Sequence, residues 1–255
     1  MDYGELLTDS FDFTRNALFG DLRRGSLLLV LYALATSSLE VLPWLLPLDA
    51  LLRFVFLVLL VVVTLASLLV LNGYACEIYR GARGPPPVED PVGLALHGVR
   101  LLLVSIVFLV PVIVVLLIFG GIGVMGILAS GQSQDMSALF SSLATLGLGM
   151  LLAVIVWVVV GLASSIAIVR CARSGEFSEA FNLEAIVLHI SRIGWVNYVV
   201  ALLLLWIVLG CAYAAIGIFG GLPVVGWVIG VVIGAAAFVF AARYLLLVFE
   251  SAPAP

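Results

Sequence analysis

The sequence predicts an all-helical protein that is embedded in a membrane and crosses it about six times. Its 255 residues are 64% hydrophobic and 10% charged, whereas soluble domains average roughly 45–50% apolar and about 25% charged residues. A soluble domain of this length leaves about a quarter of its chain surface in water, so it cannot bury so much apolar surface. The composition therefore excludes a soluble enzyme, a disordered chain and a nucleic-acid-binding protein.

Continuous apolar runs predict the membrane spans themselves. About 20 apolar residues in a helix cross the hydrocarbon core of a bilayer, and a continuous run differs from the alternating pattern of an outer-membrane barrel. Runs of sufficient length occur at residues 26–45, 54–76, 101–128, 143–169, 199–219 and 224–242. We therefore expect six transmembrane helices within a single membrane domain that covers residues 1–255.

The positions of the arginines predict the orientation. All eleven basic residues are arginine, and ten of them lie on one side of the six spans, with only Arg53 on the other side. Basic residues concentrate on the cytoplasmic side of membrane proteins. We therefore expect a multi-pass protein of the cytoplasmic membrane with both termini in the cytoplasm.

Three segments outside the spans have the spacing of amphipathic helices, namely residues 3–22, 92–100 and 177–193. In the last of them, Ile186 and Ile190 recur on one helical face. Helices of this kind lie in the plane of the membrane surface with their apolar side toward the lipid. We therefore expect three interfacial helices on the cytoplasmic side.

Two short motifs occur twice. Residues 80–83 read Arg-Gly-Ala-Arg and residues 170–173 read Arg-Cys-Ala-Arg, and the two histidines, His97 and His189, each stand three residues before an arginine. Their matching order predicts tandem units, each made of an amphipathic segment and two spans. The predicted units are 1–80, 81–173 and 174–250, followed by a flexible tail at 251–255. Whether the two histidines meet in space stays open.

The second half of the chain resembles a known family in three stretches: Arg173-Ser-Gly-Glu-Phe-Ser-Glu-Ala-Phe-Asn182, Arg192-Ile-Gly-Trp195 and Leu222-Pro-Val-Val-Gly-Trp227. They are similar to recurring features of domain-of-unknown-function family 4013, an uncharacterised family of polytopic membrane proteins met mainly in archaeal genomes. The chain departs from the family pattern at residues 84–90, where relatives tend to carry an acidic segment with tryptophan. The resemblance implies a polytopic topology and supplies no activity or catalytic residues.

Motifs of common catalytic sites do not occur in the sequence. It contains no P-loop, no HExxH zinc motif and no GxSxG nucleophile motif. Residues 121–126 match GxGxxG, but they end a span, whereas a dinucleotide site needs a strand before the glycines and a helix after them. The three cysteines are too widely spaced to indicate a disulfide framework or a zinc site. We therefore expect no catalytic residue, no cofactor, no bound metal and no enzymatic activity.

Arginines at the cytoplasmic ends of the second and fourth spans are candidate contacts for anionic lipid headgroups. These are Arg80, Arg83, Arg170 and Arg173. An arginine near an anionic membrane surface contributes about 1 kcal/mol to binding. The alternative is that the four residues only set the topology.

Three glycines of the last span predict a helix-packing seam. Gly226, Gly230 and Gly234 are spaced by four residues and share one helical face. Small residues at this spacing let two helix backbones approach closely within a membrane. The partner helix is either within the chain or in a second copy.

Ionisable residues inside or at the edge of the spans are further candidates, because they are costly to place in lipid. The candidate polar pathway near the end of the first span comprises Glu40, Ser37 and Ser38. At the other side of the membrane, Arg243 is expected to pair with Glu77 or Glu250. The alternative for Glu40 is that it faces water near the outer membrane surface, and the expected pairing of Arg243 would be structural.

The leading functional prediction is a non-enzymatic membrane component that binds or organises lipids or protein partners. It rests on the arginine-rich interfacial segments, the glycine seam and the lack of catalytic motifs. The expected partners are membrane lipids and either another protein or a second copy of the chain, with no nucleic acid. The alternative is a small-solute transporter or channel with a cavity between the repeat units.

Overall fold

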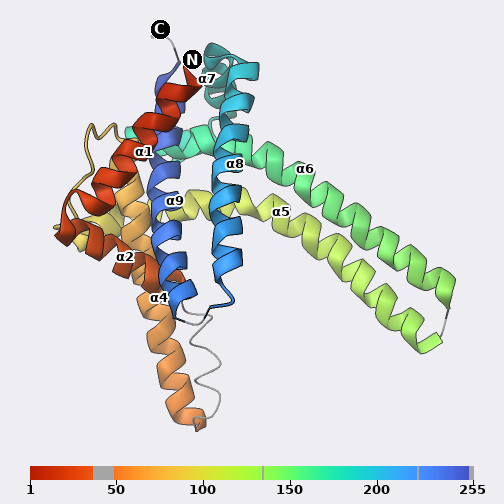
Figure 1. The fold of residues 1–255 in the computed structure, drawn as a ribbon. Coiled ribbons are helices and arrows are strands. Elements are labelled where there is room, and N and C mark those ends of the chain that lie inside the picture. Colours follow the sequence, from red (N-terminus) through yellow and green to blue (C-terminus); the bar gives the residue numbers. More distant parts are fainter. Residues whose placement is uncertain (37–48, 134, 223, 253–255) are drawn as a thin grey trace. The chain divides into compact units, whose positions relative to one another are not determined.

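The computed structural model describes residues 1–36, 49–133, 135–222 and 224–252, and within these ranges the regular structure is entirely helical. The helices are α1 (Tyr3–Phe19), α2 (Leu22–Thr36), α4 (Ala50–Tyr79), α5 (Pro91–Ser133), α6 (Met136–Ser174), η1 (Phe177–Phe181), α7 (Leu183–Ile193), α8 (Trp195–Phe219) and α9 (Val225–Glu250), as drawn in Figure 1. This confirms the predicted all-helical class.

Five of the described helices, α4, α5, α6, α8 and α9, are long and apolar enough to cross a membrane. They contain the second to fifth predicted spans and all but the first residue of the sixth, so the prediction of a polytopic membrane protein is confirmed. The first predicted span, residues 26–45, begins within α2 and continues into residues 37–48, which lie outside the described ranges, as do residues 253–255 of the predicted tail.

The chain divides into two compact units. Unit 1 combines residues 1–102 and 166–255, and unit 2 consists of residues 103–165. These boundaries differ from the ends of the tandem units expected from the repeated motifs, because unit 1 draws on all three of them. The tandem units stay a prediction.

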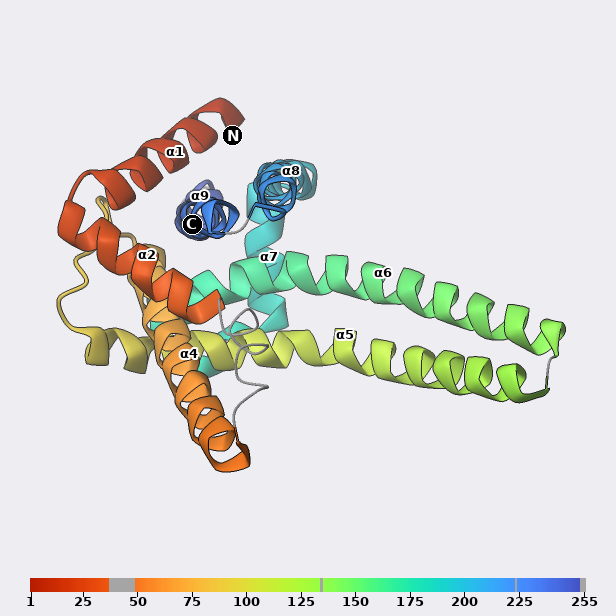
Figure 2. The same ribbon diagram turned by 60° about the horizontal axis from the view of Figure 1, so that its bottom comes forward.

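The centre of unit 1 is α9, which is the most buried of the five candidate spans. Figures 1 and 2 show α9 between α1 and α8. The Tyr244 hydroxyl of α9 is fully buried and donates a hydrogen bond of 3.0 Å to the carbonyl oxygen of Ala201 in α8. On the other side, Phe11 of α1 contacts Phe240 of α9 with ring centroids 4.7 Å apart. Hydrogen-bonded tyrosine and aromatic packing thus hold the three helices together.

The N-terminal helix α1 packs against other helices of unit 1. Asp2 caps α1, because its side chain accepts hydrogen bonds from the backbone N–H groups of Gly4 and Glu5. The apolar face of α1, which includes Phe13 and Ala17, is buried in the main core of unit 1. The apolar face that residues 3–22 were expected to turn toward lipid is therefore largely packed against the rest of the chain.

The other two predicted interfacial segments are helical, with bounds that differ from those expected. Residues 92–100 are the first part of α5, because Pro91 is compatible with a first helical turn and no other proline interrupts this stretch. Residues 177–193 form η1 and α7 as separate helices, because the Asn182 side chain accepts a 3.2 Å hydrogen bond from the Ala185 N–H and starts a new helix. The face of α7 that carries Ile186 and Ile190 is buried, and α7 packs on α8.

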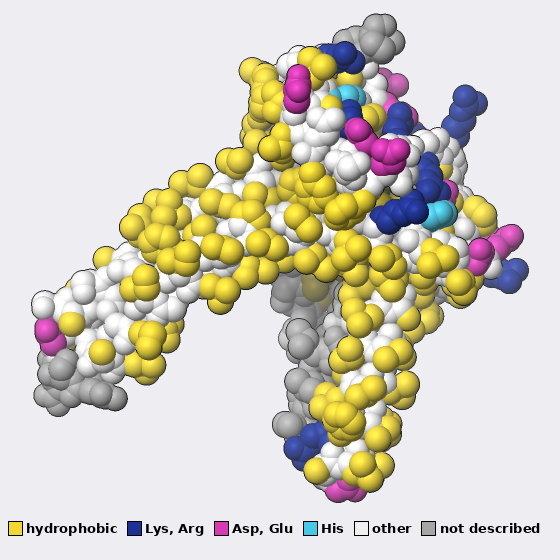
Figure 3. Space-filling view, turned by 180° about the vertical axis from the view of Figure 1, so that it is seen from behind, with side chains coloured by type: hydrophobic (Ala, Val, Ile, Leu, Met, Phe, Trp, Pro, Cys, Tyr) yellow, Lys and Arg dark blue, Asp and Glu magenta, His cyan; other side chains and the backbone are white. Residues whose placement is uncertain are grey.

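Unit 2 is an antiparallel helical hairpin made of residues 103–133 of α5 and 136–165 of α6. Small residues lie where the two helices touch: a side chain at Gly126 would collide with Ser142, and one at Gly149 would collide with Phe119. Most other apolar side chains of the hairpin are exposed. On the face drawn in Figure 3, hydrophobic side chains cover the long helices, as a lipid-facing surface requires.

The three glycines of the predicted seam have different surroundings. A Cβ atom at Gly226 would collide with the carbonyl oxygen of Phe219 at the end of α8, and one at Gly234 would collide with the Tyr32 ring of α2. A Cβ atom at Gly230 would lie 3.5 Å from Ile216 Cγ2, which is an ordinary contact. These neighbours belong to the same chain and to two different helices, so the glycines do not face a single partner.

We therefore predict opposite effects for two alanine substitutions in α9. Gly226→Ala should lower the free energy of unfolding by about 1–3 kcal/mol, because the collision is with backbone that cannot move aside. Gly230→Ala should leave stability unchanged or raise it by up to about 1 kcal/mol, because alanine favours a helix over glycine. Thermal unfolding of both variants in detergent measures the difference. Equal midpoints for the two would contradict the assigned surroundings.

Candidate functional site

Polar side chains gather at the end of unit 1 where α4, α6 and α9 finish, which we call the arginine end. Figure 3 shows most charged side chains of that face at this end of the unit. Each of six guanidinium groups bonds there to a backbone carbonyl or a carboxylate of the chain. This arginine cluster consists of Arg24, Arg80, Arg100, Arg170, Arg173 and Arg243.

Two arginines connect the ends of α4 and α6 reciprocally. Arg80 Nε donates to the carbonyl oxygen of Ala172 at 3.3 Å, and Arg173 Nε donates to the carbonyl oxygen of Tyr79 at 3.2 Å. The last four carbonyl groups of a helix have no partner within that helix, and the C-terminus carries partial negative charge. Each arginine therefore satisfies the carbonyl end of the other helix.

Two further arginines bind carbonyl groups at helix ends in the same way. Arg24 Nη2 donates to the carbonyl oxygen of Asn16, at the end of α1, at 2.6 Å. Arg100 Nη1 donates to the carbonyl oxygen of Gly175, just beyond α6, at 2.8 Å. The Arg100 contact thus joins segments that lie 75 residues apart in sequence.

Carboxylates complete the cluster. Arg170 pairs with Glu179 and Arg173 pairs with Glu250. Arg243 Nε lies 2.8 Å from Asp9 Oδ2, so the expected pairing of Arg243 with Glu77 or Glu250 is wrong. The reason is tertiary: α1 packs along α9 and brings Asp9 to the arginine.

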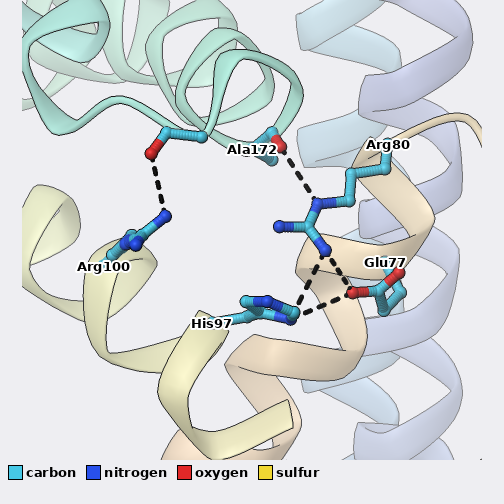
Figure 4. Close-up of polar contacts among 6 residues, drawn as sticks. Glu77, Arg80, His97, Arg100 and Ala172 are labelled. Atoms are coloured by element: carbon cyan, nitrogen blue, oxygen red, sulfur yellow. Dashed lines mark hydrogen bonds and ion pairs between the residues drawn. The ribbon is translucent and has the colours of Figure 1, made fainter. Parts of the chain in front are cut away.

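Glu77, Arg80 and His97 form the titratable centre of the arginine end, as Figure 4 shows. Glu77 Oε1 accepts a hydrogen bond from Arg80 Nη1 at 2.6 Å and lies 3.1 Å from His97 Nδ1. Arg80 Nη1 also lies 3.4 Å from His97 Nδ1. The three side chains are between 30% and 38% exposed, so water reaches them. One carboxylate thus joins a guanidinium and an imidazole from two helices.

Two glycines permit this arrangement. A Cβ atom at Gly73 of α4 would collide with the carbonyl oxygen of Leu94 in α5, and one at Gly98 of α5 would collide with the carbonyl oxygen of Leu69 in α4. The two helices therefore cross with their backbones in contact. Gly98 directly follows His97, so the crossing brings the imidazole to Glu77, one turn beyond Gly73. The sequence signal was a glycine within the predicted span 54–76 and another within the predicted amphipathic segment 92–100, and neither by itself indicates a partner.

The chemistry available to this centre is hydrogen bonding and ion pairing. Within the described ranges, no group of three or more His, Cys, Asp or Glu side chains is placed to hold a metal ion. Since each of the three side chains is directed at another, the geometry favours a link between α4, α5 and α6.

The four arginines predicted to contact lipid fall into two groups. Arg80, Arg170 and Arg173 are engaged within the protein. Arg83 is exposed and has no hydrogen-bond or ion-pair partner in the part of the chain that the structure describes. Of these four arginines, Arg83 alone presents an unshared guanidinium within the described ranges.

The predicted polar pathway of Glu40, Ser37 and Ser38 lies outside the described residues. Thr36, the residue before it, lines a cavity of about 520 Å³ among α2, α8 and α9. The cavity also borders Tyr32, Tyr213 and Trp227.

His189 has surroundings unlike those of His97. Its ring stacks on the Phe249 ring with centroids 4.0 Å apart, and its Nε2 lies 3.0 Å from the Phe249 carbonyl oxygen. Removal from water lowers the pKa of His189 below its usual range, and the charges of Arg170, Arg192 and Arg173 add to this, against the opposing effect of the hydrogen bond. His189 is therefore held as a neutral ring that donates from Nε2.

We predict that acid weakens the fold through His189. Because its pKa is lower in the folded chain, the unfolded chain binds the proton more readily, and stability should fall as the pH drops below about 6.5. His189→Gln should reduce this loss between about pH 7.5 and 5, since glutamine can donate the hydrogen bond but does not titrate in that range. Unfolding midpoints across this range measure the effect. His97→Gln is the matched control, and it should retain the loss of stability at low pH that is assigned to His189. Identical dependence of the unfolding midpoint on pH in the two variants would contradict this assignment.

The chain was compared with known protein families, curated proteins and solved structures. A model of the family described as "Protein of unknown function (DUF4013)" matches residues 56–245, which include α5, α6, α7 and α8 and most of α4 and α9. No curated protein and no solved structure matches the chain.

Proposed function

The chain belongs to the DUF4013 family, and we propose that it acts in the cytoplasmic membrane as a non-enzymatic component that binds and organises lipids or a protein partner. The observation that carries the proposal is the division among the arginines. Three of the four motif arginines bond within the protein, whereas Arg83 remains exposed beside them.

The orientation is part of the proposal. Because basic residues concentrate on the cytoplasmic side, we place the arginine end and both termini in the cytoplasm. The N-terminus and the end of α9 lie at the same end of unit 1, where Met1 and Ser251 border one crevice. This supports placing both termini on the same side of the membrane.

Lipid binding follows from the free charge of Arg83. Arg83 belongs to the connection between α4 and α5, close to the arginine end. A guanidinium in this position attracts anionic headgroups by about 1 kcal/mol. The neighbouring Arg80 cannot contribute equally, because its charge is already shared with Glu77.

A non-enzymatic role is supported by the closed polar contacts of the arginine end. Glu77, Arg80 and His97 bond to one another, and Arg80 also bonds to the Ala172 carbonyl oxygen (Figure 4). A general acid or base needs a free position within hydrogen-bond reach of its substrate. These side chains instead join helices.

Arg80 and Arg83 provide a matched test. Arg83→Gln should leave the unfolding midpoint unchanged and reduce the stabilisation that phosphatidylglycerol gives over phosphatidylcholine in nanodiscs. Arg80→Gln should lower the midpoint in both lipids, since it removes bonds to Glu77 and Ala172, at a cost of about 1–2 kcal/mol. If Arg83→Gln kept the full preference for the anionic lipid, its proposed headgroup contact would be wrong.

The alternative function is transport of a small solute. The observation in its favour is the 520 Å³ cavity bordered by Tyr32, Thr36 and Tyr213, a size within the range of about 300–1,000 Å³ that is usual for ligand pockets. A transporter would expose such a cavity to each side of the membrane in turn.

Chemical labelling separates the two functions. In a Cys211→Ser background, Thr36→Cys should react with a membrane-impermeant thiol reagent from the outer side only, because a lipid- or partner-binding protein has no inward-open state. The remaining Cys76 and Cys171 are buried, so they should contribute little labelling. Labelling from the cytoplasmic side of inverted vesicles would instead favour the transporter.

A further inference from the structure

A second cavity, of about 250 Å³, lies among α1, α8 and α9 in unit 1 and is here called the α1 groove. Phe11 and Thr14 of α1 form one side of it, Ala212 lies on the α8 side, and Ala236 and Phe240 lie on the α9 side. The alanines leave space between α8 and α9, and α1 covers that space. The helix α1, which was expected to lie on lipid, thus forms one wall of the α1 groove.

The α1 groove has no free hydrogen-bonding side chain. Thr14 is its one polar lining residue, and the Thr14 hydroxyl donates a 2.7 Å hydrogen bond to the Ser10 carbonyl oxygen. A ligand in the groove therefore has to be apolar. Its volume lies below the range of about 300–1,000 Å³ that encloses a drug-sized ligand, so it suits part of a single hydrocarbon chain.

The α1 groove lies at a depth that hydrocarbon chains reach. Leu209 lines it fourteen residues beyond Trp195, where α8 begins, and this is about 21 Å along a helix with 1.5 Å per residue. Ala236 stands fourteen residues before Glu250, where α9 ends, which is the same distance. The groove therefore borders the apolar middle of the two helices.

An unshared cation stands beside the groove. Arg15 follows Phe11 by four residues on α1, so the two side chains are neighbours on one side of that helix. Arg15 is exposed and, within the described ranges, has no hydrogen-bond or ion-pair partner. A guanidinium matches the geometry of a phosphate group and can bind it with two hydrogen bonds.

We propose that the α1 groove holds a hydrocarbon chain of a membrane phospholipid whose phosphate is bound by Arg15. The inference rests on the proposed function and deepens it, because it assigns the class of ligand and the place where it binds. The two parts are complementary: the groove accepts only apolar groups, and the adjacent arginine selects a negative charge. Neither Arg83 nor the arginine cluster takes part.

Retention of phosphatidylglycerol by the purified full chain, measured by native mass spectrometry, tests the proposal. Ala212→Phe, which fills the groove, should lower the fraction of protein with bound lipid about tenfold, or about 1.4 kcal/mol in affinity. Ala214→Phe is the control, because Ala214 is exposed on α8 and does not line the groove. Ala236→Leu fills the groove from α9 and should act like Ala212→Phe, and thermal unfolding shows that each variant is folded.

Arg15 is tested separately with the same readout. Arg15→Gln should reduce retention of phosphatidylglycerol, whereas Arg23→Gln, which changes an exposed arginine that does not line the groove, should not. Glycerol phosphate, which has the head but no chain, should not displace the bound lipid. Displacement by glycerol phosphate, or full retention in Arg15→Gln, would overturn the joint recognition of chain and phosphate.

The outcomes also separate this inference from the proposed function. If folded Ala212→Phe and Ala236→Leu retain lipid while Arg83→Gln loses its preference for anionic membranes, the groove is not a lipid site and the proposed function stands. If the groove variants lose lipid while Arg83→Gln keeps its preference, the groove inference stands and the contact at Arg83 fails.

Discussion

The carbonyl groups at the ends of membrane helices need hydrogen-bond donors, and this requirement organises the arginine end of the protein. Arg80 and Arg173 satisfy the ends of α6 and α4 reciprocally, and Arg24 does the same for α1. Because each donor comes from a different segment, satisfying the backbone also joins the helices. Carboxylates such as Glu77 and Glu250 then balance the charge that this arrangement brings in.

Close approach of backbones is the second condition for the same site. Glu77 and His97 meet where α4 and α5 cross in contact, and Gly73 and Gly98 make that crossing possible. The position of His97 follows from this crossing, because His97 is adjacent to Gly98. The Glu77–His97 contact and the two glycine contacts thus belong to the same helix crossing.

The arginines of the described ranges fall into two groups. Those of the arginine cluster bond to carbonyls or carboxylates of the chain, whereas others, such as Arg15 and Arg83, are exposed and have no hydrogen-bond or ion-pair partner within those ranges. A count of arginines along the sequence cannot tell these groups apart, because pairing depends on which carboxylate the fold brings near. Asp9 shows this, since it stands 234 residues away from the arginine it binds.

The sequence by itself determined the helical membrane class and the second to sixth spans, because hydrophobic run length depends only on local composition. It also pointed to the arginine motifs and to both histidines. Only the tertiary structure decided which arginines are shared, which glycines touch backbone and where α1 lies. Residues 92–100 and 177–193 show the same limit, because a cap at Asn182 and the continuation of α5 are settled by specific neighbours. Which residues far apart in the sequence contact each other is decided by tertiary packing, and the periodicity of hydrophobic residues carries no information about these contacts.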